Sequence, residues 1–260
     1  MTQTPDALFD VAGKGIVVAG AGGGLAGNIV RALDRRGARL VLFDNHPGRL
    51  AAVAAQVPAA TALPGDITDE ESLATVMAAA GEALGRVDGA VNAAGVLPID
   101  LADDLDTRVF QECQDVNVTG AFLFSRAAAR AMRATAGGDG GGDGGRIVHL
   151  ASVSSFVANP GYAAYASSKG GLAQLVRVLA REWAAEGITV NAIGPALTET
   201  PLTAGYLADP GFRRRAIEVI PMGRLGTPAD IVAAVLLLLA PGGAFITGQT
   251  ICVDGGRTLV

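Results

Sequence analysis

The chain has 260 residues, 50% of them hydrophobic, with two cysteines and a formal net charge of −5, which suits one globular domain over residues 1–260 and excludes a disulfide framework, a cysteine metal site or a disordered chain. The longest apolar run, Ile231–Ala240, is about half the ~20 residues of a membrane span, and the acidic N-terminus lacks the basic start of a secretion signal, so we expect a cytoplasmic protein with no membrane partner. No basic cluster exceeds Arg213–Arg215, and this charge pattern excludes a nucleic-acid-binding protein.

Short runs of Val, Ile and Leu recur along the chain and give the predicted strands. Unbroken apolar runs of this kind are typical of parallel strands that helices cover on both faces of a sheet. Seven runs are predicted as strands: Gly15–Ala19, Arg39–Phe43, Thr61–Pro64, Gly89–Asn92, Arg146–Ala151, Ile188–Ile193 and Thr250–Val253.

Segments with helical periodicity alternate with these strands. They are Leu25–Arg36, Pro47–Gln56, Glu70–Leu84, Leu105–Met132, Tyr162–Glu186 and Pro228–Leu239. Alternating strands and helices predict a doubly wound α/β fold of the Rossmann-like kind, with right-handed crossovers. We therefore expect a seven-stranded parallel sheet flanked by helices on both faces.

Two segments fit neither pattern. Gly137–Gly145, with the sequence GGDGGGDGG, is interpreted as a surface loop, because ordering a glycine-rich segment costs much conformational entropy. Pro201–Pro221 is interpreted as a long connection of the size that often covers a binding site. Residues 201–221 are therefore predicted to form a substrate lid within the single domain.

A glycine-rich turn follows the first predicted strand and opens the first helix. It contains Gly20, Gly22, Gly23, Gly24 and Leu25. Glycines let the backbone turn tightly and approach a pyrophosphate, whose charge the free N–H groups of a helix N-terminus then stabilise. The alternative is a glycine-rich turn without a ligand, but the strand before it and the helix after it favour a dinucleotide site.

Polar residues also follow the next three predicted strands. Asp44 ends the second strand, close to the ~20-residue spacing at which a carboxylate accepts hydrogen bonds from the adenosine ribose; the alternative is a cap for the helix that starts at Pro47. Asp66 follows the third strand, and the segment Asn92, Ala93, Ala94, Gly95 follows the fourth. Open α/β sheets bind ligands at these carboxyl ends, although a simple loop cap explains Asp66 and Asn92 equally well.

Tyr165 and Lys169 are candidates for proton transfer. They are one turn apart on the same face of a predicted helix. A cation near a phenol lowers the pKa of the phenol from ~10 toward neutral pH, as a proton-transfer catalyst requires. This spacing also arises by chance, but Ser152, in the serine-rich turn after the fifth strand, adds a hydroxyl able to bond a substrate oxygen.

In this order, the motifs resemble the short-chain dehydrogenase/reductase family, in its single-domain Rossmann-type branch. The resemblance covers Gly15–Gly256 and includes Asn117, the segment 191–200 and the closing motifs 246–249 and 253–256. The chain departs from the family pattern at Ala19, Ala26 and Ala196, where the family usually has Thr, Gly and Gly. None of these departures touches the proton-transfer residues.

The resemblance implies a role for each of four catalytic residues. Tyr165 would be the general acid/base on the substrate oxygen, and Ser152 would hold and polarise that oxygen. Lys169 would bond the nicotinamide ribose and lower the pKa of Tyr165. Asn117, on the predicted helix Leu105–Met132, would position a water molecule in a proton relay to solvent.

It also implies a bound nicotinamide dinucleotide. The expected cofactor contacts are Gly20, Gly22, Gly23, Gly24, Leu25, Asp44, Asn45, Asp66, Ile67, Asn92, Ala93, Ala94, Gly95, Tyr165, Lys169, Pro195, Ala196, Leu197, Thr198 and Thr200. We expect NAD(H) rather than NADP(H), because the Asp44 carboxylate would repel the additional phosphate of NADP.

The expected substrate pocket consists of Leu97, Ser154, Tyr162, Leu202 and Tyr206. These residues indicate a small, moderately apolar alcohol or ketone, and the absence of Arg and Lys from Val96–Pro98 disfavours a phosphorylated one. The predicted protein is an NAD(H)-dependent alcohol dehydrogenase or carbonyl reductase that forms a homotetramer. The alternatives are an NADPH-dependent 3-oxoacyl thioester reductase and a non-catalytic dinucleotide-binding regulator.

Overall fold

The computed structural model of the chain describes residues 5–136 and 144–260. Its strands are β1 (Gly15–Ala19), β2 (Arg39–Asp44), β3 (Thr61–Pro64), β4 (Gly89–Asn92), β5 (Gly145–Leu150), β6 (Ile188–Pro195) and β7 (Thr250–Val253). Within the described residues they form one seven-stranded sheet in the order β3-β2-β1-β4-β5-β6-β7, and each neighbouring pair is parallel. The chain thus winds outward from β1 in both directions, which confirms the predicted doubly wound fold.

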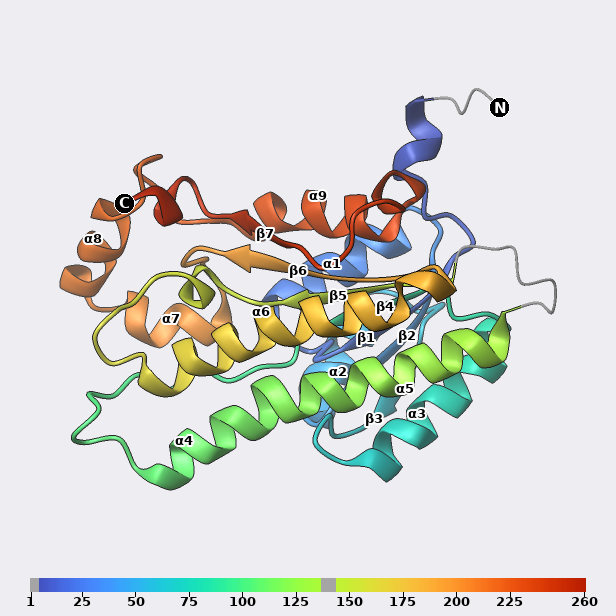
Figure 1. Cartoon of the computed structure of the whole chain (residues 1–260), viewed down its shortest axis with the longest axis horizontal. Coiled ribbons are helices and arrows are strands. Elements are labelled where there is room, and N and C mark those ends of the chain that lie inside the picture. Colours follow the sequence, from blue (N-terminus) through green and yellow to red (C-terminus); the bar gives the residue numbers. More distant parts are fainter. Residues whose placement is uncertain (1–4, 137–143) are drawn as a thin grey trace.

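The helices lie on both faces of this sheet. They are α1 (Gly24–Asp34), α2 (Pro47–Ala54), α3 (Glu70–Leu84), α4 (Thr107–Gln114), α5 (Gly120–Thr135), α6 (Ala163–Trp183), α7 (Pro201–Leu207), α8 (Pro210–Glu218) and α9 (Pro228–Leu239). One face packs against α1, α2 and α9, and the other against α3, α5 and α6 (Figure 1). Across the described ranges, none of the helices combines the length and the apolar character needed to span a membrane.

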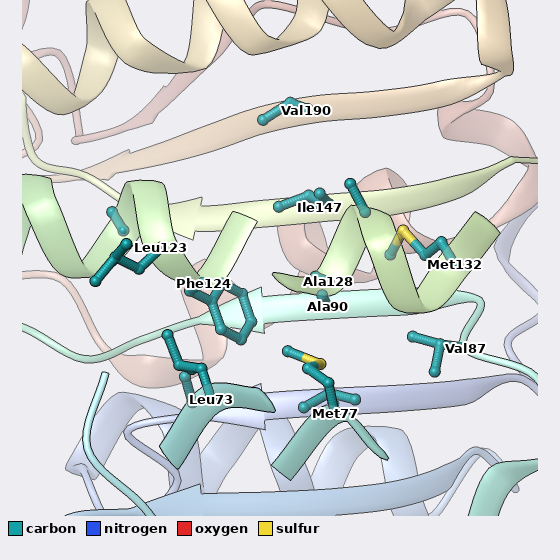
Figure 2. Packing of buried hydrophobic residues seen from close by; sticks show 14 of the residues in the cluster. Leu73, Met77, Val87, Ala90, Leu123, Phe124, Ala128, Met132, Ile147 and Val190 are labelled. Atoms are coloured by element: carbon teal, nitrogen blue, oxygen red, sulfur yellow. The ribbon is translucent and has the colours of Figure 1, made fainter. Parts of the chain in front are cut away.

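The core is built on both faces because side chains alternate along each strand. In β1, Ile16 and Val18 point toward α1 and α9, whereas Val17 points toward α3 and α5. Figure 2 shows this second face, where Phe124 of α5 and Leu73 of α3 lie over the sheet. Full burial of one such side chain stabilises the fold by roughly 1.5–3 kcal/mol. The strand ends that carry the polar motifs are therefore fixed by a core on either side.

The predicted helix Leu105–Met132 is wrong in its middle. The residues Asp115–Thr119, between α4 and α5, form a π-helical turn (η2). Such turns insert an extra residue into a helix and are frequent at functional sites. Right after it, Gly120 lies so close to another segment that a Cβ there would come within 2.9 Å of Cγ2 of Ile67. Contacts with a distant segment leave no trace in helical periodicity, so the sequence did not show the interruption.

The predicted lid, residues 201–221, is largely helical, whereas the sequence predicted an irregular connection. It contains α7 and α8, which start at Pro201 and Pro210 directly after the capping residues Thr200 and Asp209. A capping residue followed by proline is a recognised helix start, and segment length alone did not reveal it. Most of the other irregular segment, Gly137–Gly145, lies outside the described residues, although Gly145 itself begins β5.

Candidate active site

A cleft of about 1690 Å³ runs along the carboxyl ends of the strands. It exceeds the roughly 300–1,000 Å³ of a pocket for one small ligand, so a dinucleotide and a substrate fit in it together. The expected site residues that line it are Gly20, Gly22, Gly23, Gly24, Leu25, Asp44, Asn45, Asp66, Ile67, Ala93, Ala94, Gly95, Leu97, Ser152, Ser154, Tyr162, Tyr165, Lys169, Pro195, Ala196, Leu197, Thr198, Thr200 and Leu202. Three other expected residues, Asn92, Asn117 and Tyr206, lie outside this lining.

The glycine turn has no room for side chains at three positions, one of which is Gly22, where a Cβ would lie 2.7 Å from Cβ of Arg49. Gly20 has a φ of 66°, and a Cβ there would lie 2.6 Å from the main-chain nitrogen of Ala94. At Gly24, a Cβ would lie 2.3 Å from Cδ of Pro201. Helix α1 starts here with no side-chain cap, because its N-cap residue is Gly23. The turn therefore presents main-chain N–H groups to the cleft, which is the arrangement that accommodates a pyrophosphate.

Asp44 is fixed at the end of β2 by two main-chain groups. The N–H of Gly22 donates to Oδ2 with an N–O distance of 3.0 Å, and the N–H of His46 donates to Oδ1 at 2.8 Å. The cap of α2 is His46, whose Nδ1 accepts from the N–H of Arg49 at 3.2 Å. The alternative interpretation of Asp44 as the cap of this helix is therefore wrong, and its carboxylate joins the glycine turn to the wall of the cleft.

Asp66 lines the cleft and also caps its own turn. Its Oδ1 accepts hydrogen bonds from the N–H and the hydroxyl of Thr68, at 2.8 and 2.7 Å. The loop-cap alternative is thus part of what Asp66 does. Its Oδ2 accepts no hydrogen bond from the described residues and remains available to a ligand.

Asn92 does not line the cleft. Its side chain is buried beneath the turn after β4 and stabilises that turn. Its Oδ1 accepts the N–H of Ala94 at 3.0 Å, and its Nδ2 lies 3.2 Å from Nδ1 of the fully buried His149. The other ring nitrogen of His149 lies 2.9 Å from Oγ of Ser125, which donates its own proton to the carbonyl of Ala121. Burial lowers the pKa of His149 to about 3, so the ring is neutral. This contact between Asn92 and His149 could not be predicted from the sequence, because the two residues lie on different strands.

Ser152, Tyr165 and Lys169 meet at one end of the cleft. Ser152 follows β5 and its Oγ accepts the N–H of Ser154 at 3.1 Å. Tyr165 and Lys169 project from α6, as their spacing predicts, and Nζ of Lys169 lies 5.6 Å from the centre of the Tyr165 ring. The ammonium also donates to the carbonyl of Leu150 at 2.9 Å. Strand β5 and helix α6 thus fix a hydroxyl, a phenol and an amine around one point.

The expected lowering of the pKa of Tyr165 is wrong for the chain by itself. Burial raises the pKa of Tyr165 to about 12, against the opposing effect of a hydrogen bond with Ser152. Burial also lowers the pKa of Lys169 to about 8. Desolvation disfavours both charged forms here. Tyr165 consequently keeps its proton at neutral pH, which suits a donor to a carbonyl oxygen.

Asn117 is buried in the π-helical turn η2 with both ends of its amide occupied. Its Oδ1 accepts the N–H of Val96 at 2.9 Å, and its Nδ2 donates to the carbonyl of Val96 at 3.0 Å and to Oγ of Ser168 at 2.9 Å. Ser168 in turn donates to the carbonyl of Tyr165 at 2.7 Å. The side chain thus ties the segment after β4 to the helix that carries Tyr165. A role in a water relay stays a prediction.

Two arginines to which the sequence assigned no role in the site, Arg215 and Arg257, complete the other end of the cleft. Tyr206 lies outside the lining because its hydroxyl donates to the carbonyl of Leu97 at 3.2 Å and its ring packs against Phe212. Phe212 and Arg215, both on α8, line the cleft, as does Arg257 after β7. The motif pattern contains no signal for Arg257, because only the fold brings the C-terminal segment beside the loop that precedes α6.

Comparison with known proteins agrees with this geometry. A family model described as enoyl-(acyl carrier protein) reductase matches residues 20–258. The galactitol 2-dehydrogenase (L-tagatose-forming) of Cereibacter sphaeroides is 38% identical over 256 residues, covering 97% of this chain and 98% of that protein. The NAD-dependent glycerol dehydrogenase of Listeria innocua is 34% identical over 257 residues, covering 98% and 97%. The crystal structure of a short-chain type dehydrogenase/reductase from Mycobacterium marinum has a TM-score of 0.89 at 30% identity, covering 99% and 100%.

These matches extend over the glycine turn, the strand-end motifs and the Ser152, Tyr165 and Lys169 cluster alike. The family model matches residues 20–258, and two relatives are 38% and 34% identical over nearly the whole chain. This extent of similarity assigns the chain to a family. The protein belongs to the short-chain dehydrogenase/reductase family and is an oxidoreductase of that type.

Proposed function

We propose that the protein transfers a hydride between NAD(H) and the carbinol or carbonyl carbon of a small alcohol or ketone. The observation that carries the proposal is the meeting of Ser152, Tyr165 and Lys169 in one cleft with the glycine turn and Asp44. The relatives named for galactitol and glycerol oxidation support a substrate of the polyol type. Hydride exchange at the substrate carbon is the chemistry that a bound nicotinamide supplies.

The residues of the chain fit such a cofactor. The first turn of α1 would hold the pyrophosphate, because Gly20 and Gly24 lie where no Cβ fits. Asp44 would accept hydrogen bonds from the adenosine ribose. At the other end, Lys169 would bond the nicotinamide ribose, and the segment 195–198 with Thr200 would hold the carboxamide. All of these residues line the same cleft.

Tyr165 would exchange a proton with the substrate oxygen, and Ser152 would form a hydrogen bond to it. In carbonyl reduction, the phenol of Tyr165 donates its proton to that oxygen. In alcohol oxidation, the phenol first releases this proton to an acceptor such as a water molecule, and the phenolate then accepts the proton of the alcohol. Oγ of Ser152 accepts the N–H of Ser154, so the serine hydroxyl acts as a donor in the cleft: it bonds Tyr165 in the chain alone and would bond and polarise the substrate oxygen when a substrate is bound. Lys169 uses one of its three N–H groups on Leu150, which leaves two for hydroxyls of the ribose.

The test is a binding measurement beside a turnover screen. NADH binding is followed by fluorescence, and absorbance at the nicotinamide band reports turnover of secondary alcohols and polyols with NAD and of a 3-oxoacyl thioester with NADPH. We expect turnover of alcohols with NAD. Binding of NADH without turnover of any compound would instead favour a non-catalytic regulator, and preferential turnover of the thioester would favour an acyl thioester reductase.

Replacing Lys169 should weaken both cofactor binding and turnover. We expect Lys169→Met to raise the Kd for NADH and lower kcat, each by about 10-fold or more, because a hydrogen bond from a charged group contributes about 1.5–3 kcal/mol. Lys14, the other lysine of the sequence, lies before β1 outside the cleft lining, and Lys14→Met is the matched control. Titration and steady-state kinetics on both variants measure the effects. An unchanged Kd in Lys169→Met would remove this residue from the cofactor site.

We also propose that the protein is a cytoplasmic homotetramer. The helices α5 and α6 and the C-terminal segment leave apolar side chains exposed, among them Phe122, Val178 and Leu259. A tetramer with dihedral symmetry would cover such surfaces by pairing helices across one interface and C-terminal segments across another. Light scattering should give about four times the chain mass of 26.1 kDa. A stable species of the single-chain mass at micromolar concentration would contradict the proposal.

A further inference from the structure

We propose that the substrate carries a carboxylate remote from the reacting carbon, and that Arg215 and Arg257 bind this carboxylate. The inference rests on the proposed function, because it names the class of substrate that the same site oxidises: a hydroxy acid. Both arginines line the cleft together with Ser152 and Tyr165. Neither belongs to the motifs that carry the hydride-transfer chemistry.

Arg215 lies on the face of α8 that borders the cleft. This face consists of Phe212, Arg215, Ala216 and Val219, which is the spacing of one helical stripe. The two arginines before it are engaged elsewhere, since Arg213 pairs with Glu199 and Arg214 with Glu218. Arg215 has no hydrogen-bond or ion-pair partner within residues 5–136 and 144–260. The helix thus presents one unpaired guanidinium to the cleft.

Arg257 reaches the cleft from the segment after β7. This segment packs on the end of the lid, because the N–H of Met222 donates to the carbonyl of Gly255 at 3.1 Å, and Figure 1 shows the C-terminus near α8. The guanidinium is half-buried and held in place: Nη2 donates to Oδ1 of Asn159 and Nη1 to the main-chain oxygen of Val260, both at 3.1 Å. These two bonds use two of its five N–H groups.

No acidic side chain of the described lining forms an ion pair with Arg215 or Arg257, although the carboxylate of Asp209 lies near Arg215, with Oδ1 of Asp209 and Nη1 of Arg215 each 3.3 Å from where a Cβ on Gly211 would lie. Asp44 and Asp66 follow β2 and β3, and the other acids of the lining, Glu112 and Asp115, belong to α4 and η2. A third arginine of the lining, Arg108, already forms an ion pair with Asp106, 2.7 Å from Nη2 to Oδ2. Arg215 and Arg257 are therefore the cleft-lining guanidiniums beside α8 that remain available to an anion among the described residues.

Guanidinium groups select carboxylates for a geometric reason. The planar fork of N–H donors matches the two oxygens of a carboxylate, and such charge-assisted bonds are roughly twice as strong as neutral ones. A neutral polyol would gain little from these charges. A substrate with its secondary alcohol at Tyr165 and a carboxylate at Arg215 and Arg257 would use both ends of the pocket, so these residues set specificity without touching the reacting atoms.

The test compares acids with neutral polyols of equal carbon number. The pairs are D-gluconate with D-glucitol and D-threonate with D-threitol, each measured with NAD. We expect kcat/KM for at least one acid to exceed that of its partner by about 10- to 100-fold, the effect of hydrogen bonds to a charged group. Arg257→Gln and Arg215→Gln should each lower kcat/KM for the acid by about 10-fold, a larger loss than for the neutral polyol, so that the preference for the acid shrinks.

Arg214→Gln is the matched control. It removes the same charge from the position next to Arg215, but the side chain of Arg214 pairs with Glu218 and does not line the cleft. It should leave the preference for acids intact, and Arg257→Lys should restore part of it relative to Arg257→Gln. Equal or faster turnover of the neutral partners, or preference for a phosphorylated polyol such as D-glucitol 6-phosphate, would overturn the inference while the proposed dehydrogenase function stands.

A calorimetric titration of D-gluconate into the full-length protein with NADH separates the inference from the proposed function. If no alcohol of either kind is oxidised, the proposed function fails; binding of D-gluconate that is lost in Arg257→Gln and kept in Arg214→Gln would still support the carboxylate site. If the unaltered protein neither binds nor oxidises D-gluconate or D-threonate, the proposal of a carboxylate site at Arg215 and Arg257 is overturned.

Discussion

Tyr165→Phe is expected to lower kcat by at least about 100-fold while the Kd for NADH stays within a few-fold. Burial raises the pKa of Tyr165 to about 12, so the phenol holds a proton that it gives up only to a partner in the cleft. The change removes that proton carrier and keeps the ring, which packs against the ring of Tyr162 with 6.0 Å between centroids. The loss should therefore fall on turnover and spare the fold.

Tyr162→Phe is the matched control for this change. Tyr162 also lines the cleft and also loses only a hydroxyl, but it has no lysine one turn further along the helix. Steady-state kinetics on both variants, with NADH titration, compare the two phenols directly. Retention of most activity in Tyr165→Phe, or a larger loss in Tyr162→Phe, would mean that the proton carrier has been misassigned.

The sheet and the strand-end motifs could be predicted because both depend on local sequence. β1, β3, β4 and β7 have the predicted bounds, since each apolar run ends where its polar motif begins. Parallel strands bring their carboxyl ends to one edge of the sheet. Residues that follow different strands therefore line one cleft although they lie far apart in sequence.

What the sequence did not show depends on contacts between distant segments. The π-helical turn is held through Asn117, whose amide bonds Val96 and Ser168, and neither contact is visible in the periodicity of its own helix. The direction of the pKa shift of Tyr165 was wrong because spacing places Lys169 near the phenol but says nothing about its desolvation. Arg257 was missed for the same reason, since its place depends on the packing of the segment after β7.

Asp44 should make the enzyme prefer NAD(H) over NADP(H) by about 10- to 1,000-fold in kcat/KM. NADP carries a phosphate where NAD has a ribose hydroxyl, so the carboxylate would meet an anion in place of a hydrogen-bond donor. At about 4 Å, two like unit charges repel by about 1 kcal/mol in water and about 4 kcal/mol near a protein surface. Two main-chain N–H groups hold the carboxylate in place, so it cannot easily turn away from the phosphate.

Arg49 is the residue that opposes this preference. It lines the cleft, is exposed, and has no hydrogen-bond or ion-pair partner for its guanidinium among the residues that the structure describes. Its Cβ is near the glycine turn, 2.7 Å from where a Cβ on Gly22 would lie. A long side chain rooted there is within range of a phosphate beside Asp44. We therefore expect Arg49→Gln to widen the preference for NAD(H), since it removes the cation that would offset the repulsion.

Steady-state kinetics with both cofactors measure the contribution of Asp44. Asp44→Asn should narrow or invert the preference, because it removes the charge but keeps an oxygen that can accept from Gly22 or His46. Asp69→Asn is the control, since Asp69 caps α3 through the N–H of Glu71 at 2.9 Å and lies outside the cleft lining. Equal kcat/KM values for the two cofactors in the unaltered enzyme would mean that Asp44 only holds the glycine turn. If Asp44→Asn and Asp69→Asn shifted the ratio equally, the preference would arise from overall charge and not from a carboxylate at the ribose.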